Sequence, residues 1–401
     1  HAGLPRKRCV ALSCGWLHAV AVLDSGVAVA WGSNEFGQLG TGDERKARDP
    51  VRCAVDSDVT LKHVACGSYF TCCVDADGAL YSWGRYQASN SPTKFVDTWA
   101  NGYASRGDHG IRGETVVQVA AGEAHTIVAT ASGKLFSWGY NEQWQLGWGQ
   151  KEAEHQGQQK PKQIVLPASF ATDGPLRALS CGGQHTCVVD ARGTLFAWGA
   201  NYEGQIGRVI RQAHGDPDVV SAIEADEVAT VACGRYSTLA VTAAGDAFFW
   251  GSLSGSAAQA SQGAAAANGG QQDAKDGAPP SADPGEAPAF GALSGAARML
   301  AGAQKQHVGS NVADGKVGEA HGVLRRSGNA LAGWGYNAYG QALGVVDSKT
   351  DVIDAPRPVQ LAEDLFDPAT QSVLYIGVAG GTTTLLVSPP SVAASTSSSA
   401  E

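Results

Sequence analysis

The chain has 401 residues, of which 43% are hydrophobic and 17% are charged, and its formal net charge is -9. This acidic balance argues against a general nucleic-acid binder, because neutralising phosphates requires clustered Lys and Arg. No apolar run approaches the roughly 20 residues that span a bilayer, so no membrane-spanning helix is expected. The 52 glycines exceed the usual share of about 7%, which indicates many tight turns.

A Trp-Gly dipeptide occurs six times, and each tryptophan follows a glycine by 16 residues. The tryptophans are Trp31, Trp83, Trp138, Trp198, Trp250 and Trp334. The glycines are Gly15, Gly67, Gly122, Gly182, Gly234 and Gly318. Between them lie two short apolar runs around a turn that contains Gly or Asn, which is typical of a β-hairpin. The interval from glycine to tryptophan is constant, whereas the distance from one unit to the next varies. Such a recurring unit predicts a repeat architecture.

In most units the chain continues after Trp-Gly into a segment close to Asn-x-x-Gly-Gln-Leu-Gly. The segment spans residues 34–40, 141–147, 201–207 and, with one extra residue, 337–344. A seventh opening half is visible at 378–387, but Thr396 and Ser397 stand where its Trp-Gly would fall. Either the ring takes strands from a segment before residue 1, or its last blade is incomplete.

Several short strands per repeat, without helical periodicity, predict an all-β fold and a β-propeller. The motifs resemble the RCC1 family (regulator of chromosome condensation), whose repeats join a Cys-Gly-x-x-His-Thr half to a Trp-Gly-x-Asn-x-x-Gly-Gln-Leu-Gly half. The resemblance covers residues 9–252 and 317–387. It implies a seven-bladed propeller of four-stranded antiparallel blades over residues 1–387. The insert 253–290 lacks large apolar side chains and is expected to be disordered, and 388–401 to form a flexible tail.

The conspicuous repeated side chains are expected to be structural. Tryptophan is a large apolar side chain with one N–H to satisfy, so the six Trp-Gly tryptophans should fill the core. The motif histidine is present as His18, His125, His185 and His321. One histidine per blade distributes the rings around the propeller, so each is expected to bond a neighbouring backbone group rather than share a catalytic or metal site.

No cofactor or metal site is expected from the nine cysteines, because no Cys-x-x-Cys pair occurs. Cysteines that recur in register with a core behave as small buried hydrophobes. They also favour a reducing, intracellular compartment.

The two residues between the opening glycine and the motif histidine vary from unit to unit, and their common spacing should bring them to one rim of the ring. The candidate partner-binding residues there are Trp16, Tyr69, Glu123, Arg235, Tyr236 and Glu319. Aromatic and Arg side chains concentrate in interface hot spots. The alternative is a solvated rim without a partner.

Two branches of the RCC1 family bear on the function of this rim. In the exchange-factor branch acidic residues at these positions face the GTPase, a role that Glu123 and Glu319 match in charge. The photoreceptor branch would need several clustered tryptophans in a Gly-Trp-Arg-His-Thr context. Only Trp16 qualifies, and Leu17 follows it instead of Arg, so the photoreceptor branch is rejected.

Residues 85–115 replace the Gly-Gln-Leu-Gly segment of the second unit with a long polar loop. Long loops on rigid scaffolds are favoured places for function. The candidate partner-binding residues in this loop are Trp99, Arg106, Asp108, His109 and Arg112. The alternative is a surface loop without a function.

The sequence contains no phosphate-binding glycine loop with Lys, no His-Glu-x-x-His and no nucleophile elbow, so a non-catalytic protein is predicted. We predict a protein-interaction scaffold that works as a subunit of a larger assembly. The alternative is a guanine-nucleotide exchange factor for a Ran-like small GTPase, which would weaken nucleotide binding without covalent chemistry. The degenerate second and fifth units favour the scaffold.

Overall fold

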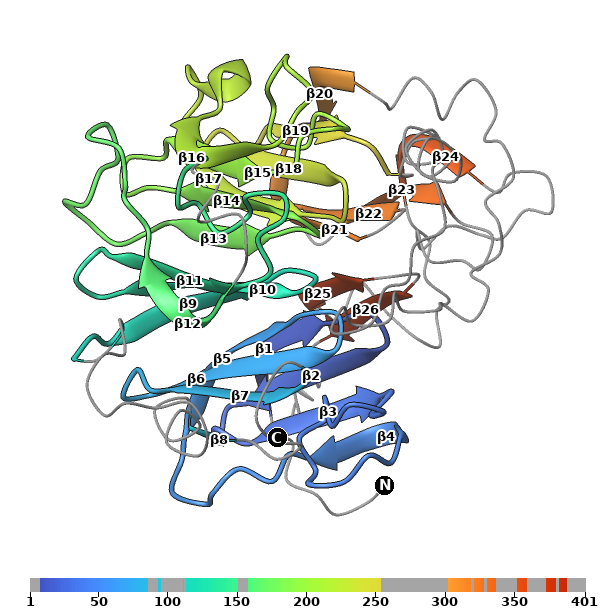
Figure 1. The fold of residues 1–401 in the computed structure, drawn as a ribbon. Helices are drawn as coiled ribbons and strands as arrows, with labels where there is room; N and C mark the ends of the chain where they lie inside the picture. The colour runs from blue at the N-terminus through green and yellow to red at the C-terminus, as the bar shows by residue number, and fades with distance from the viewer. Residues whose placement is uncertain are drawn as a thin grey trace, which may run out of the picture.

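The computed structural model describes residues 8–85, 93–94, 111, 113–150, 158–253, 302–318, 321–327, 330–336, 352–358, 373–379 and 382–387. These residues form six four-stranded antiparallel sheets and one two-stranded sheet. The sheets are arranged as blades around a common axis, with the first strand of each blade innermost (Figure 1). No helix among the described residues is long and apolar enough to cross a membrane.

The first three blades follow one another along the chain. Blade 1 consists of β1 (Cys9–Cys14), β2 (His18–Leu23), β3 (Ala28–Gly32) and β4 (Ala47–Arg52). Blade 2 consists of β5 (Leu61–Cys66), β6 (Phe70–Asp75), β7 (Leu80–Gly84) and β8 (Thr93–Lys94). Blade 3 consists of β9 (Val116–Ala121), β10 (His125–Thr130), β11 (Leu135–Gly139) and β12 (Gln158–Gln163). The short β8 lies inside the segment 85–115 that the sequence predicts to be a loop.

The remaining blades repeat the same order. Blade 4 consists of β13 (Ala178–Cys181), β14 (His185–Val189), β15 (Leu195–Gly199) and β16 (His214–Val219). Blade 5 consists of β17 (Val228–Cys233), β18 (Ser237–Thr242), β19 (Ala247–Gly251) and β20 (Gly302–Gly309). Blade 6 consists of β21 (Val312–Val317), β22 (His321–Arg326), β23 (Leu331–Tyr336) and β24 (Val352–Pro358). A two-stranded sheet of β25 (Val373–Ala379) and β26 (Thr382–Val387) follows.

The prediction of seven four-stranded blades is wrong, because the described residues form six such blades and the pair β25–β26. This pair corresponds to the opening half of a repeat, and the Trp-Gly half that supplies the third strand of every other blade is missing after it. Strand β25 contacts β1 on one side and β21 on the other. The two-stranded sheet therefore lies between blades 1 and 6 (Figure 1).

The hydrophobic core lies between neighbouring blades rather than inside any one of them. Between blades 1 and 2, Val20 and Leu39 pack with Cys73 and Trp83, all at most 1% exposed. Comparable clusters join blades 2 and 3, 3 and 4, 4 and 5, and 5 and 6. Each blade is thus stabilised by the burial of apolar surface against the next one.

The Trp-Gly and Gly-Gln-Leu-Gly motifs meet across these junctions. The Trp83 indole N–H donates to the backbone carbonyl oxygen of Gln38 in blade 1 at 2.9 Å. The same bond joins Trp198 to Gln145 at 2.9 Å and Trp250 to Gln205 at 3.0 Å. Trp334 follows the fifth unit, in which this segment is absent after Trp250. The buried indole N–H of Trp334 has no hydrogen-bond partner among the described residues.

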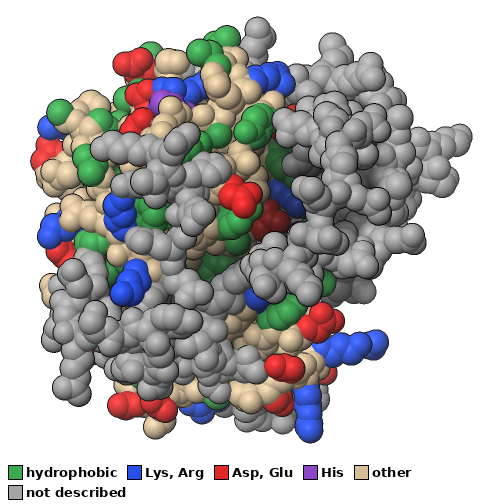
Figure 2. Space-filling model, viewed as in Figure 1, with side chains coloured by type: hydrophobic (Ala, Val, Ile, Leu, Met, Phe, Trp, Pro, Cys, Tyr) green, Lys and Arg blue, Asp and Glu red, His purple; other side chains and the backbone are tan. Residues whose placement is uncertain are grey.

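The expected disordered insert 253–290 and tail 388–401 lie outside the described residues, apart from Leu253. On the face drawn in Figure 2, acidic and basic side chains are interspersed over the described residues, without a continuous basic stripe.

Candidate functional site

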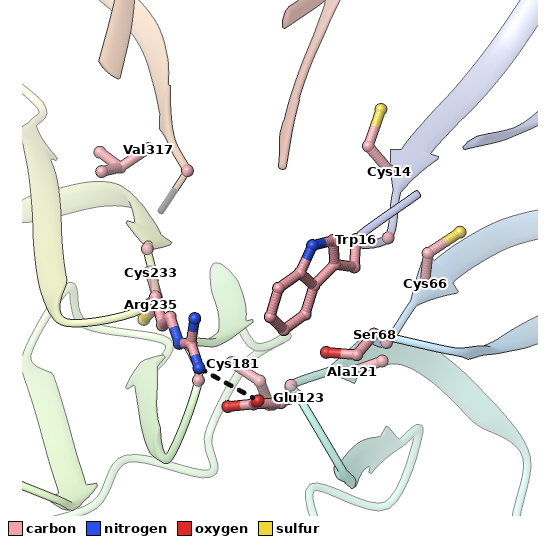
Figure 3. A pocket seen from close by; sticks show the side chains of 17 residues that line it. Cys14, Trp16, Cys66, Ser68, Ala121, Glu123, Cys181, Cys233, Arg235 and Val317 are labelled. Atoms are coloured by element: carbon pink, nitrogen blue, oxygen red, sulfur yellow. Dashed lines mark hydrogen bonds and ion pairs between the residues drawn. The ribbon is translucent and has the colours of Figure 1, made fainter. Parts of the chain in front are cut away.

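The connections between the first and second strands of the blades meet at one end of the central axis. There they surround a hollow of about 130 Å³, seen from close by in Figure 3. The first variable residue of each of the first five blades lines this hollow. These residues are Trp16, Ser68, Glu123, Gly183 and Arg235. We call this hollow and its five lining residues the channel mouth.

Backbone hydrogen bonds connect these five residues from blade to blade. The amide N–H of Trp16 donates to the carbonyl of Ser68 at 3.3 Å, and Ser68 donates to Glu123 at 3.2 Å. Glu123 donates to Gly183, and Gly183 to Arg235, each at 3.3 Å. A last bond runs from Arg235 to Gly318 of blade 6 at 3.3 Å. This chain of bonds holds the variable residues close to the axis, whatever their side chains are.

A charged pair spans the channel mouth. A guanidinium nitrogen of Arg235 in blade 5 lies 3.5 Å from a carboxylate oxygen of Glu123 in blade 3 (Figure 3). Blade 4 stands between them, and its Gly183 leaves the room that Arg235 needs. A Cβ at Gly183 would come within 3.0 Å of the Arg235 Cγ. The two side chains are 27% and 31% exposed, so the pair contributes little stability and remains accessible to charges on another molecule.

Aromatic rings and guanidinium groups extend from this pair across blades 1 and 2. The Arg235 guanidinium lies 5.0 Å from the ring centroid of Trp16, and Trp16 stacks on Tyr69 at 6.1 Å with an interplanar angle of 15°. Tyr69 meets the edge of Phe36 at 5.1 Å. Arg85 lies 4.7 Å from the Phe36 centroid and 5.6 Å from that of Tyr69. We call these five residues the aromatic row, and all five are half-buried.

The structure brings five of the six predicted rim residues together. Trp16, Tyr69, Glu123 and Arg235 belong to the channel mouth or the aromatic row, and Tyr236 lies under the Arg235 guanidinium at 5.2 Å. The sixth, Glu319, lies outside the described residues, as do all five loop candidates. These are Trp99, Arg106, Asp108, His109 and Arg112.

The sequence interpretation missed two members of the aromatic row, Phe36 and Arg85. Phe36 lies in the turn after the first Trp-Gly, and Arg85 directly follows the second Trp-Gly. The position of Arg85 could have been inferred from the register of the hairpin, in which Phe70 pairs with Gly84. This register places the residue after Trp-Gly beside the second variable residue, and the Arg85 amide N–H donates to the Tyr69 carbonyl at 2.9 Å.

The motif histidines lie at the blade junctions and not at the channel mouth. His18 Nε2 lies 3.0 Å from the Thr71 hydroxyl of the next blade, and His125 Nε2 lies 3.1 Å from that of Thr186. The partner is thus a threonine hydroxyl of the next blade, where a backbone group was expected. Burial lowers the pKa of His18 to about 4 and that of His125 to about 3, so both are neutral near pH 7.

Comparisons with known proteins agree with this architecture. The family model described as the RCC1-like domain matches residues 1–269. The ultraviolet-B receptor UVR8 of Arabidopsis thaliana is 33% identical over 242 residues, which are 60% of this chain and 52% of that protein. The probable E3 ubiquitin-protein ligase HERC6 of Homo sapiens is 31% identical over 235 residues, which are 57% of this chain and 22% of that protein. The match thus spans about half of the first relative and less of the second.

Solved structures share the fold at lower sequence identity. The structure of Prp20p from Saccharomyces cerevisiae is 17% identical, with a TM-score of 0.66, and the match covers 92% of this chain and 80% of that one. The structure of human WBSCR16 is 16% identical, with a TM-score of 0.69, and covers 97% and 88%. At these identities the similarity shows the fold alone.

Proposed function

The chain belongs to the family of RCC1-like domains, and from that premise we propose that it is a protein-interaction scaffold. In this proposal a partner protein binds at the channel mouth and the aromatic row. The scaffold works as a subunit of a larger assembly, and the repeated Trp, His and Cys side chains hold the ring together.

The observation that carries this proposal is the continuous contact from Arg235 to Arg85 through Trp16, Tyr69 and Phe36. Closing the ring does not require these large side chains, because blades 2 and 4 carry Ser68 and Gly183 where blade 1 carries Trp16. Half-buried Trp, Tyr and Arg side chains are the types that dominate interface hot spots.

The dimensions of the hollow also favour a protein partner. Pockets for organic ligands usually have volumes of about 300–1,000 Å³, and the hollow has about 130 Å³. A space of this volume fits one inserted side chain better than a cofactor. The Glu123–Arg235 pair at its edge offers a charge of either sign to an incoming group.

Guanine-nucleotide exchange on a Ran-like small GTPase is the second candidate. It is supported by the acidic Glu123 at the channel mouth, and by the fold shared with Prp20p, whose solved structure is described together with its binding to Gsp1p and histones. Because Arg235 already pairs with the Glu123 carboxylate, an exchange role would require that pair to open.

Affinity capture from native extract tests the scaffold proposal. We expect the double variant Trp16→Ala/Tyr69→Ala to lose a partner that the unmodified chain retains. The control is Tyr202→Ala in blade 4, because Tyr202 is 42% exposed and lies outside the aromatic row. Equal capture by the double variant would contradict the proposed surface.

A nucleotide-release assay with a panel of small GTPases separates the two candidates. The scaffold proposal predicts no acceleration of release. Acceleration that disappears in Glu123→Gln would establish the exchange factor instead.

A further inference from the structure

Three side chains with metal-binding atoms converge between blades 4 and 5. His185 and Cys187 lie on β14, and Cys233 ends the innermost strand β17 of the next blade. One ligand atom from each residue can be chosen so that all three lie within 4.8 Å of one another. His185 and Cys187 are buried, whereas Cys233 is half-buried and lines the hollow, as Figure 3 shows. A mixture of nitrogen and sulfur ligands is the set that zinc prefers.

The hydrogen bonds around His185 determine which of its nitrogens carries the proton. The Thr238 hydroxyl donates to the Gln205 carbonyl at 2.7 Å, so toward His185 Nε2, at 2.9 Å, it can only accept. Nε2 therefore carries the hydrogen, and the lone pair is on Nδ1. This Nδ1 is buried and has no hydrogen-bond partner among the described residues. A neutral imidazole oriented through its other nitrogen is the usual state of a histidine ligand.

The corresponding junctions of other blades show which feature is specific to the junction of blades 4 and 5. An unpartnered buried Nδ1 recurs at His18 and His125, so that feature belongs to the repeat motif. Two positions after these histidines, however, the chain has Val20 and Ile127 where blade 4 has Cys187. A second thiol beside the histidine and the cysteine of the next blade is therefore what distinguishes the junction of blades 4 and 5.

The distances and charges suit a dication. Zinc lies about 2.3 Å from sulfur and about 2.0 Å from nitrogen in a tetrahedral site. The three ligand atoms lie within 4.8 Å of one another, whereas ligand atoms of one tetrahedral zinc ion are about 3.5–3.8 Å apart, so binding requires them to approach by up to about 1.3 Å. Two thiolates and a neutral imidazole would balance a doubly charged ion, which leaves no net charge in the buried site. A singly charged ion would leave one negative charge uncompensated.

We propose that His185, Cys187 and Cys233 bind a zinc ion at the junction of blades 4 and 5. The ion reaches the site through the hollow that Cys233 lines, and a water molecule from the hollow fills the fourth position. On binding, each of the two thiols gives up its proton to solvent. Because both thiols lose a proton when the ion binds, binding weakens as the pH falls.

Titration of the full, reduced and metal-free chain with Zn²⁺, in competition with a chromophoric chelator, tests this site. We expect one equivalent to bind, and Co²⁺ in its place to give a sulfur-to-cobalt charge-transfer band. Cys187→Val should weaken binding by at least about 100-fold, since loss of even an outer partner of a metal ligand weakens binding about 10–100-fold. Val20 stands at the corresponding position of blade 1, so the fold accommodates this side chain.

Two further variants complete the experiment. Cys233→Val, which reproduces Val317 of blade 6, should weaken binding to the same extent. Cys72→Val is the matched control, because Cys72 holds the place of Cys187 in blade 2 but lies two residues after Phe70 instead of a histidine. It should bind zinc like the unmodified chain.

Zinc should also raise the thermal unfolding midpoint of the unmodified chain but not that of the Cys187→Val variant. The proposal would be overturned if no stoichiometric Zn²⁺ binding occurred, if Cys187→Val bound equally well, or if only Cu⁺ bound. The site does not depend on the partner surface, so its failure would leave the scaffold proposal standing.

Discussion

Burial lowers the pKa of the motif histidines His18, His125 and His321, so these three rings are neutral near pH 7. Desolvation lowers the pKa of His18 from 6.5 to about 4, while in the unfolded chain the imidazole titrates near its usual value of about 6.5. The unfolded state therefore binds more protons below pH 6.5. The stability that depends on the neutral ring is complete above pH 6.5 and is lost as the pH falls toward 4.

We accordingly expect the free energy of unfolding to fall steeply between pH 6.5 and 4. The variant His18→Phe, which reproduces Phe70 of blade 2, should remove up to about 1.4 kcal/mol per pH unit from this slope. Urea denaturation followed by tryptophan fluorescence at several pH values measures it. A slope identical to that of the unmodified chain would show that His18 is not among the titrating groups.

Part of the candidate site could be predicted from the spacing of residues along the chain, and part depends on contacts between blades. The common spacing predicted a shared rim, and the structure places Trp16, Glu123 and Arg235 around the hollow, with Tyr69 stacked on Trp16. The spacing could not show that Gly183 opens a path for Arg235 across blade 4, because that depends on a contact between blades. The convergence of His185, Cys187 and Cys233 was missed for a similar reason, since the three side chains come from different positions of two repeats.

At the level of strands and turns, the asparagine that follows Trp-Gly stabilises the turn after it. This turn forms hydrogen bonds with the next blade. In blade 4, the Asn201 side-chain amide donates to the carbonyls of Arg208 at 3.1 Å and Ile210 at 2.7 Å. Its side-chain oxygen accepts from the Ile206 amide at 3.1 Å. The turn then presents the Gln205 carbonyl to Trp250 and Thr238 of blade 5.

Replacing this asparagine should therefore weaken the junction of blades 4 and 5. We expect Asn201→Ala to destabilise the chain by about 2–4 kcal/mol, because buried backbone groups lose their partners. Equilibrium urea unfolding gives the value, with Tyr202→Ala as the neighbouring control. A loss as small as that of Tyr202→Ala would mean that the turn holds its shape without the side chain.

The hairpins themselves could be predicted from the sequence, because the 16-residue interval fixes the register between the second and third strands. The number of complete blades was predicted wrongly, because the resemblance to a seven-bladed family outweighed the missing Trp-Gly at Thr396 and Ser397, which had left an incomplete last blade as one of two alternatives. Nor could spacing show the row of backbone bonds at the channel mouth, because each of these bonds joins two different blades.

In the molecule as a whole, a sheet with half the usual number of strands lies between blades 1 and 6. Strand β25 contacts β1 of blade 1 and β21 of blade 6, so the pair β25–β26 covers the facing sides of these two blades. Apolar blade faces that lose this cover would be exposed to water, and uncovered sheets are prone to associate.

Removing residues 373–401 should therefore lower the thermal unfolding midpoint and cause self-association. Removing only 388–401 is the control and should change neither. Thermal denaturation and sedimentation velocity measure the two effects. If both truncated chains were equally stable and monomeric, β25 and β26 would not be needed for closure.

The central claim is that the variable residues at the channel mouth bind a partner while the repeated residues hold the ring. The dissociation constant of the captured partner, measured by calorimetry for the unmodified chain and for Trp16→Ala, tests it most directly. A hot spot of at least 2 kcal/mol corresponds to an increase of about 30-fold or more, and Tyr202→Ala should leave the constant unchanged. An unchanged dissociation constant in Trp16→Ala would contradict the claim.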